Sequence, residues 1–255
     1  MEKKWTMFLT FIFATLLLFG ITFTLFAGGG KTSKPSIEAV KKELQKTLPR
    51  FSISEVNETP IPGIYEVVGE TGTIIYYSPK GYLFFGEIWT VDGRSLTAEK
   101  RQIIQEKRIA KIVDTLPLDK ALKVGNGPKK IIEVSDPTCP HCRNAYNTLK
   151  NHKDITKYVF FFPIHGEHSL KAIAYIVCSE NPEKKYEDVY EGKEDNQIEK
   201  FEISPACQQK VENLLDEHIK VVRTLQVRGT PYFIIGKTPV EGANIPLIEK
   251  LLSSK

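Results

Sequence analysis

The chain has 255 residues and a formal net charge of +4, and 41% of its residues are hydrophobic and 26% are charged. These values are ordinary for a globular protein, and the length allows one or two domains with a substantial core. Because acidic and basic residues are interleaved along the chain, the sequence offers no dedicated nucleic-acid surface.

Residues 1–30 have the features of an export segment. Lys3 and Lys4 precede 21 residues without a charge, at 7–27, and small residues follow. A cleaved signal peptide usually has a shorter apolar region, whereas this length also suffices to span a bilayer. The sequence therefore leaves two readings open, a cleaved signal peptide or a retained membrane anchor, and both predict that the rest of the chain is exported.

Residues 31–94 predict a small α+β module. Apolar residues recur at helical spacing over 37–48, and strand-like runs separated by turn signals follow. The last run, at 82–91, is apolar enough to form a pairing edge of a sheet. A module of this size is marginally stable alone, so we expect it to have a partner.

Residues 95–117 predict one long, polar helix that links two bodies. Thr97 is the expected N-cap, Glu99 lies in the first turn, and Pro117 ends the helix. About 20 helical residues would span ~30 Å.

Residues 118–255 alternate between strand and helix patterns, which predicts an α/β domain with a central sheet. The charged stretch at 179–200 is expected to be a helical surface insertion, because Tyr186, Val189 and Tyr190 recur at helical spacing. The other expected elements are strands at 129–135, 158–164 and 231–236, and helices that begin at Pro140, after Ser169 as N-cap, near residue 205 and at Pro246.

The four cysteines would lie in an oxidising compartment if the chain is exported. Four cysteines allow three pairings. The Cys-x-x-Cys spacing favours a local pair between Cys139 and Cys142, which leaves Cys178 with Cys207.

The stretch DPTCPHC, at 136–142, places two of these thiols at the start of a predicted helix. Pro140 suits the first helical position, so Cys139 is expected at the helix N-terminus, where free N–H groups and the helix dipole favour the thiolate. His141, if protonated, would add a positive neighbour, and Cys142 is expected on the buried face. Because a stabilised thiolate stabilises the reduced pair, these features predict an oxidising disulfide.

Two further features are expected beside the thiols. Glu133 is a lone charge in an apolar strand, and its carboxyl could take up and return the proton of Cys142; the alternative is a strand-end glutamate that reaches water. Pro231 opens a core-like strand, where proline is unusual, and a cis peptide between Thr230 and Pro231 would explain it.

A zinc site is the main alternative for the cysteine pair. Cys139 and Cys142 together with His165 and His168 would supply four ligands, but the gap of 22 residues and the close spacing of the two histidines do not fit the usual patterns. We therefore expect no metal, and a purely structural disulfide between Cys139 and Cys142 is also disfavoured.

Several stretches together resemble the DsbC/DsbG-type periplasmic disulfide isomerases of the thioredoxin superfamily. The resemblance covers nearly the whole chain after the export segment and is carried by LDKALKVGNGPKKIIEVSDPTCPHCR, CSENPEKKYEDVYEGK, GTPYFIIG and TPIPGIYEVVGETGTIIYYSPKGYLFFGEIWTVDG. It implies a thioredoxin-like catalytic domain with a helical insertion at 118–255, preceded by the linker helix at 95–117 and a dimerisation module at 31–94.

The resemblance also implies roles for particular residues. Cys139 would be the attacking cysteine and Cys142 the resolving one, with no cofactor beyond their redox-active disulfide. Thr230 and Pro231 would form a substrate-facing cis-proline loop, and Cys178–Cys207 would be a structural disulfide.

The implied function is a periplasmic homodimer that rearranges incorrect disulfides in misfolded exported proteins, with possible chaperone activity, and is kept reduced by a membrane thiol reductase. The Pro-His dipeptide between the cysteines is, however, that of DsbA-type oxidases. A dithiol oxidase and a non-catalytic holdase chaperone therefore stand as the alternative functions.

Overall fold

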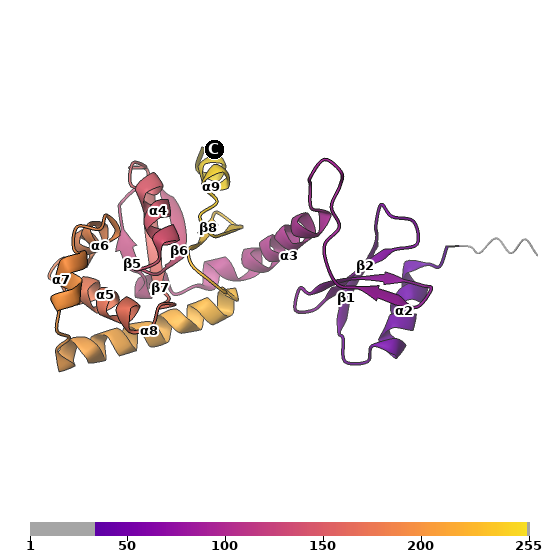
Figure 1. Ribbon diagram of the computed structural model, residues 1–255, viewed down its shortest axis with the longest axis horizontal. Coiled ribbons are helices and arrows are strands. Elements are labelled where there is room, and N and C mark those ends of the chain that lie inside the picture. The colour runs from indigo at the N-terminus through magenta and orange to yellow at the C-terminus, as the bar shows by residue number, and fades with distance from the viewer. Residues whose placement is uncertain (1–33, 254–255) are drawn as a thin grey trace, which may run out of the picture.

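The computed structural model describes residues 34–253, and Figure 1 shows them as two bodies joined by a helix. The expected export segment at 1–30 lies outside the described residues. Within residues 34–253, no helix is both long and apolar enough to cross a membrane.

The N-terminal body packs one helix against an antiparallel sheet. The helix α2 (Ile37–Thr47) is capped by Ser36, whose side chain accepts from the N–H of Ala39. Val40 and Leu44 of the helix are buried against residues of the sheet such as Val67. The strands lie in chain order: β1 (Ile53–Glu58), β2 (Tyr65–Gly69), β3 (Ile74–Ser78) and β4 (Tyr82–Phe84).

The expected strand over 82–91 was wrong in length, because β4 ends at Phe84. The backbone of Ile88 is bonded to the start of the next helix instead of to β3: its N–H donates to Thr97 Oγ1 (2.8 Å) and its carbonyl accepts from the N–H of Leu96 (3.0 Å). Phe85 and Trp89 consequently protrude into solvent, with 77% and 59% of their surfaces exposed.

The linking helix α3 (Leu96–Ile112) is capped by Ser95 and not by the expected Thr97. Thr97 is buried, and its hydroxyl contacts Tyr76 Oη while accepting from Ile88. The helix is also shorter than expected, because 3₁₀ turns at Val113–Thr115 and Leu118–Lys120 follow it.

Side chains of α3 are bonded to both the N-terminal and the C-terminal body. Lys100 pairs with Glu55 of β1 (2.7 Å) in the N-terminal body. Arg108 donates to the carbonyls of Thr224 (3.1 Å) and Leu225 (2.6 Å), and Gln102 donates to the carbonyl of Pro239 (3.1 Å), all in the C-terminal body.

The C-terminal body is built on a five-stranded mixed sheet with the order β5-β7-β6-β8-β9. Strands β6 and β7 run parallel at its centre, and the other neighbours are antiparallel. The two short edge strands had not been expected from the sequence. The strands are β5 (Leu122–Val124), β6 (Lys129–Ser135), β7 (Ile155–Phe161), β8 (Tyr232–Ile235) and β9 (Thr238–Glu241).

Helices cover both faces of this sheet (Figure 1), as the alternation of side chains along β6 requires. Ile131 packs with α4 (Pro140–Leu149) and α9 (Ile245–Ser253) on one face. Ile132 and Val134 pack on the other face with Val222 of α8 (Pro205–Leu225) and with Ile109 of α3. The helices predicted from Pro140 and over 205–225 are thus confirmed.

The stretch between β7 and α8 is helical. It contains α5 (Glu167–Val177), α6 (Pro182–Tyr190) and α7 (Asp195–Lys200), so the helical insertion expected at 179–200 is present as two helices. The expected N-cap Ser169 was wrong: Gly166 is the N-cap, and Ser169 lies inside α5 with its hydroxyl bonded elsewhere.

A disulfide joins Cys178, at the end of α5, to Cys207 in the first turn of α8, with a Cα–Cα distance of 5.8 Å. This is the pairing that the resemblance implied. It ties the insertion to the helix that follows it.

One buried histidine fixes the packing of α8 on the sheet. His218 is fully buried; its Nδ1 accepts from the N–H of Phe161 (2.8 Å), and its Nε2–H donates to the carbonyl of Lys120 (2.9 Å). Burial lowers the pKa of His218 from 6.5 to about 4, so the imidazole is neutral in the folded protein.

We expect this histidine to make the stability depend on pH. Because the folded pKa is lowered, the unfolded chain takes up a proton first, and stability present above pH 6.5 is lost as the pH falls toward 4. Between pH 7.5 and pH 5 the loss should be about 2 kcal/mol. Urea unfolding of the protein and of a His218→Gln variant, which keeps one donor and one acceptor, measures it. An equal pH dependence in both proteins would contradict the assignment.

Candidate active site

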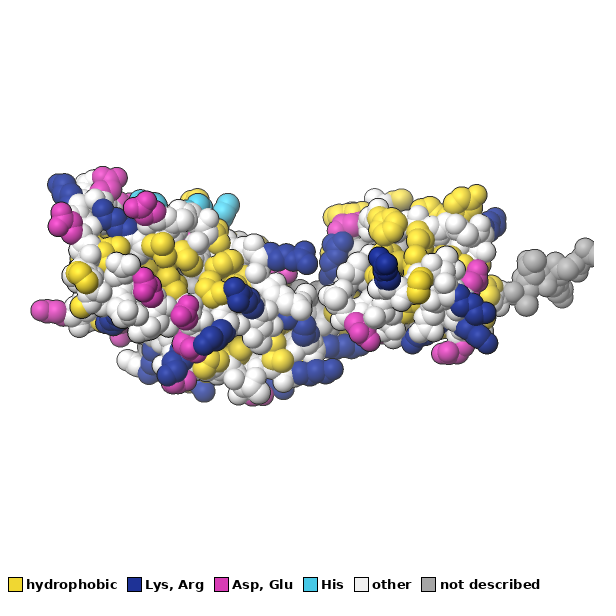
Figure 2. All heavy atoms as spheres, turned by 90° about the horizontal axis from the view of Figure 1, so that it is seen from below, with side chains coloured by type: hydrophobic (Ala, Val, Ile, Leu, Met, Phe, Trp, Pro, Cys, Tyr) yellow, Lys and Arg dark blue, Asp and Glu magenta, His cyan; other side chains and the backbone are white. Residues whose placement is uncertain are grey.

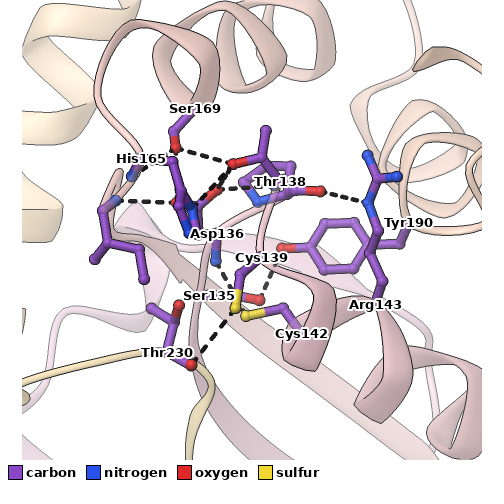
Figure 3. A network of polar contacts seen from close by, with 12 residues as sticks. Ser135, Asp136, Thr138, Cys139, Cys142, Arg143, His165, Ser169, Tyr190 and Thr230 are labelled. Atoms are coloured by element: carbon purple, nitrogen blue, oxygen red, sulfur yellow. Dashed lines mark hydrogen bonds and ion pairs between the residues drawn. The ribbon is translucent and has the colours of Figure 1, made fainter.

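The two free cysteines lie where β6 passes into α4. Cys139 is the N-cap of α4, Pro140 is the first helical residue, and Cys142 lies one turn further on. Figure 3 shows the two sulfur atoms pointing toward one another. The strand delivers the chain to the helix N-terminus, where unpaired N–H groups and the dipole favour an anion.

Cys142 lies in the core. It is fully buried together with Ala145, Tyr146 and Leu149, as the sequence predicted, and its sulfur accepts from the N–H of Asp136 (3.5 Å). Burial raises the pKa of the Cys142 thiol to about 12, against the effect of that hydrogen bond. Cys142 is therefore protonated at neutral pH.

Cys139 contacts the loop that precedes β8. Its S–H donates to the carbonyl of Thr230 (3.6 Å), and the peptide bond between Thr230 and Pro231 is cis. The Pro231 carbonyl accepts from the N–H of Gly242 (2.9 Å). The structure thus brings Cys139, Cys142 and this loop together, while His141 is exposed on the first turn of α4.

Glu133 does not reach water, so the alternative of a solvated strand-end glutamate does not hold. Only 1% of the residue is exposed, and both carboxylate oxygens accept from Tyr186 Oη (3.3 Å). Lys157 Nζ lies 3.7 Å from Glu133 Oε2 and donates to Tyr186 Oη (3.0 Å).

Lys157 completes this buried cluster. Its ammonium lies over the rings of Tyr146 (4.8 Å) and Tyr186 (4.5 Å), and Tyr186 stacks on Tyr190. Burial lowers the pKa of Lys157, and the charge of Glu133 partly offsets this. Glu133 makes no direct hydrogen bond to Cys142, and Tyr190, which stacks on Tyr186, donates to Ser135 Oγ (2.7 Å).

The two histidines of the zinc alternative are not brought to the cysteines as a ligand set. His165 Nδ1 faces the carboxylate of Asp136 at 3.0 Å, and His168 is exposed on α5. Within the part of the chain that the structure describes, no group of three or more His, Cys, Asp or Glu side chains is arranged to hold a metal.

Family models match the chain in two places. A model of the disulfide bond isomerase protein N-terminal domain matches residues 31–98, and a model of the thioredoxin-like domain matches residues 116–244, which is half of the chain. The chain belongs to the thioredoxin-like family. Its sheet and helices fit that membership, and α6 and α7 form the helical insertion of the thioredoxin-like domain.

The curated relatives described here are named as thiol:disulfide interchange proteins. The chain is 29% identical over 204 residues to the probable thiol:disulfide interchange protein DsbC of Bordetella parapertussis, covering 77% of this chain and 66% of that one. It is 22% identical over 236 residues to the thiol:disulfide interchange protein DsbC of Pasteurella multocida, covering 91% and 92%. The chain thus spans slightly less than two thirds of the length of the Bordetella relative.

Solved structures with similar folds include α-DsbA2 from Wolbachia pipientis, a thiol-disulfide exchange protein, with 23% identity, a TM-score of 0.48 and coverage of 59% of this chain and 96% of that one. A disulfide interchange protein from Neisseria gonorrhoeae has 25% identity, a TM-score of 0.41 and coverage of 53% and 94%.

Sequence reasoning missed several residues of the thioredoxin-like site. Lys157 lies outside the strand expected at 158–164, but β7 is Ile155–Phe161, and within it Lys157 is a lone charge among apolar residues, as Glu133 is in β6. The register pairs Ile131 with Lys157 and Glu133 with Val159, so the two charges are diagonal neighbours on one face. Asp136 carries the pattern of an Asx turn, with its Oδ1 accepting from the N–H of Thr138.

Proposed function

We propose that the chain is a periplasmic thiol:disulfide interchange enzyme whose main reaction is the isomerisation of incorrect disulfides in exported proteins. One observation carries the proposal: two free thiols lie at the N-terminus of α4, and that of Cys139 contacts the backbone of the Thr230–Pro231 loop. The N-terminal match to disulfide isomerases and the names of the curated relatives support it.

The reaction begins with Cys139. Its thiolate attacks one sulfur of a substrate disulfide, which forms a mixed disulfide and releases the other sulfur as a thiolate. If a second substrate thiolate then attacks the mixed disulfide, a new substrate disulfide forms and Cys139 leaves unchanged, without net oxidation. If Cys142 attacks instead, the substrate leaves reduced and the Cys139–Cys142 disulfide remains, so a thiol reductase, which we expect in the membrane, must restore the pair.

The two thiols differ in a way that favours isomerisation. Cys142 is buried and has a pKa of about 12, so it must lose its proton before it can attack the mixed disulfide. The substrate thiol therefore has time to resolve the mixed disulfide first.

We assign Glu133 the role of proton acceptor for Cys142. Both residues are buried in the same body, and the carboxyl group of Glu133 is bonded to Tyr186 and lies beside the amine of Lys157. Because no direct contact joins Glu133 to Cys142, the proton has to pass through a hydroxyl group or a water between them.

A substrate strand would bind beside Pro231. The carbonyl of Thr230 lies next to Cys139, so a peptide that pairs with this backbone brings its disulfide to the nucleophile. We therefore assign Thr230 and Pro231 to substrate binding.

We further propose that a second copy of the chain covers the open edge of the N-terminal sheet. β4 is an edge strand, and Tyr82, Phe85 and Trp89 beside it are 62%, 77% and 59% exposed. Figure 2 shows hydrophobic side chains gathered on this body. An unpaired edge with large apolar side chains is a pairing surface.

A dithiol oxidase is the second candidate. The observation in its favour is the exposed His141 beside Cys139 at a helix N-terminus, since a positive charge there stabilises the thiolate and makes the disulfide a stronger oxidant.

We expect Cys139→Ala to reduce the refolding of a scrambled-disulfide substrate to the uncatalysed rate, because the nucleophile is gone. Cys142→Ala should keep part of the activity, since a substrate thiol can still resolve the mixed disulfide. If Cys139→Ala keeps the full refolding yield, the protein is a holdase and not an isomerase. If the pair of the unaltered protein is trapped mainly oxidised in the exported compartment, the oxidase is the better description.

We expect Glu133→Gln to slow the attack of Cys142 on a Cys139–glutathione mixed disulfide by about 10²-fold or more, because the proton acceptor is lost. Stopped-flow release of glutathione measures the rate. The single variant leaves Lys157 buried without its counter-ion, so Glu133→Gln with Lys157→Met serves as a second variant that removes both charges. Glu217→Gln, which breaks an exposed pair with Lys220, is the control. Unchanged rates in both Glu133 variants would refute the role.

We expect the protein to have the mass of two chains in solution, and Phe85→Glu with Trp89→Glu to give the mass of one, because the charges cannot be buried at the sheet edge. Light scattering after size exclusion measures both. Ile203→Glu, at an exposed apolar residue of the other body, should leave the mass unchanged. A monomeric unaltered protein would remove the dimer from the proposal.

A further inference from the structure

Asp136 has no part in the reaction proposed above, yet it is fully buried between the redox pair and α5 (Figure 3). Its Oδ1 accepts from both the N–H and the hydroxyl of Thr138, each at 2.8 Å. These two bonds close the turn that leads to Cys139.

The other carboxylate oxygen binds a segment about 30 residues away. Oδ2 accepts from Ser169 Oγ (2.7 Å), the N–H of Ile164 (2.9 Å) and His165 Nδ1 (3.0 Å). His165 and Ser169 also lie within 3.2 Å and 3.1 Å of Thr138 Oγ1, so the turn and the start of α5 form one network.

The backbone of Asp136 contacts both cysteines. Its carbonyl accepts from the N–H of Cys139 (3.1 Å), and its N–H donates to the sulfur of Cys142 (3.5 Å). A single residue therefore binds the backbone of Cys139 and the sulfur of Cys142, and its side chain carries a carboxylate.

This carboxylate is ionised. Burial alone would raise the pKa of Asp136, but the hydrogen bonds from Ser169, Thr138 and His165 lower it below its usual value. A negative charge inside the protein is poorly screened, so it acts strongly on a neighbouring thiolate. Its sign is opposite to that of the helix N-terminus and of a protonated His141.

We propose that Asp136 is a positioning residue that lowers the oxidising strength of the Cys139–Cys142 disulfide. Its buried negative charge disfavours the Cys139 thiolate, so the disulfide is a weaker oxidant than the α4 N-terminus and His141 alone would make it. The inference rests on the proposed thiol chemistry and deepens it. It explains how a Cys-Pro-His-Cys pair can serve a protein that works by isomerisation.

The equilibrium with glutathione tests the proposal. One protein disulfide and two glutathione molecules give one protein dithiol and one glutathione disulfide, so a more stable thiolate shifts the balance toward the dithiol. Asp136→Asn keeps the oxygen that binds Thr138 and removes the charge. We expect it to raise this equilibrium constant about three- to tenfold and to move the midpoint of Cys139 alkylation to lower pH.

Two variants separate charge from structure. Ser169→Ala removes the shortest hydrogen bond to Asp136 but leaves the charge, so it should lower stability to urea and change the equilibrium constant less than twofold. Asp154→Asn makes the same chemical change at an exposed aspartate and should change nothing.

A third variant keeps the test valid if Asp136→Asn does not fold. His165→Lys puts a permanent cation beside the carboxylate at a residue whose side chain is 45% exposed, and it should shift the equilibrium in the same direction as Asp136→Asn. His168→Lys makes the same change three residues later, in the first turn of α5, where the side chain has no bond to Asp136, and is its control.

The inference is overturned if neither Asp136→Asn nor His165→Lys shifts the equilibrium toward the dithiol, or if Ser169→Ala shifts it as far as Asp136→Asn does. These readouts need no isomerisation of a protein substrate. A failure of the refolding assay would therefore refute the proposed function without deciding this inference, and the reverse also holds.

Discussion

The start of α4 at the end of β6 is the constraint on which the site depends. The central strand brings the chain to a point where Pro140 can open a helix, and Cys139 then takes the N-cap position. One helical turn later Cys142 necessarily faces the core, because it shares the buried stripe with Ala145 and Leu149. The same short segment thus places one thiol, the proposed nucleophile, at a positive helix end and the other in the core, where it is protonated.

Two buried carboxylates flank this segment, and the protein stabilises them differently. Glu133 lies beside the amine of Lys157 and accepts from a tyrosine hydroxyl, so it has a basic partner within the cluster. Asp136 is held mainly by N–H and hydroxyl donors, which stabilise the anion without removing its negative charge. In the roles proposed for them, the first carboxylate accepts a proton and the second, whose charge has no full counter-ion, adjusts the redox equilibrium.

Local patterns predicted the parts of the fold that depend on nearby residues. The buried stripe of α4, the extent of α8 and the lone charge Glu133 could all be read from spacing and composition. The caps of α3 and α5 could not, because Thr97 and Ser169 are bonded to distant partners, Tyr76 and Asp136. The edge strands β5 and β9 are too short for periodicity to reveal, and the apolar run after Phe84 gave no sign that Ile88 would bond to α3 instead of extending β4.

The helix α3 connects the N-terminal sheet to the segment that leads into the Thr230–Pro231 loop. Arg108 binds the last carbonyls of α8, and Gln226, with a positive φ, turns the chain there toward Thr230. Lys100, two turns earlier on the same helix, is bonded to β1 of the N-terminal body. Since α3 is bonded to both bodies, it belongs to the fold of each and is more than a tether. In a dimer that pairs through the N-terminal sheets, these bonds would therefore fix the distance and the direction between the two nucleophiles, which is the geometry that an isomerase needs to hold one misfolded chain between them.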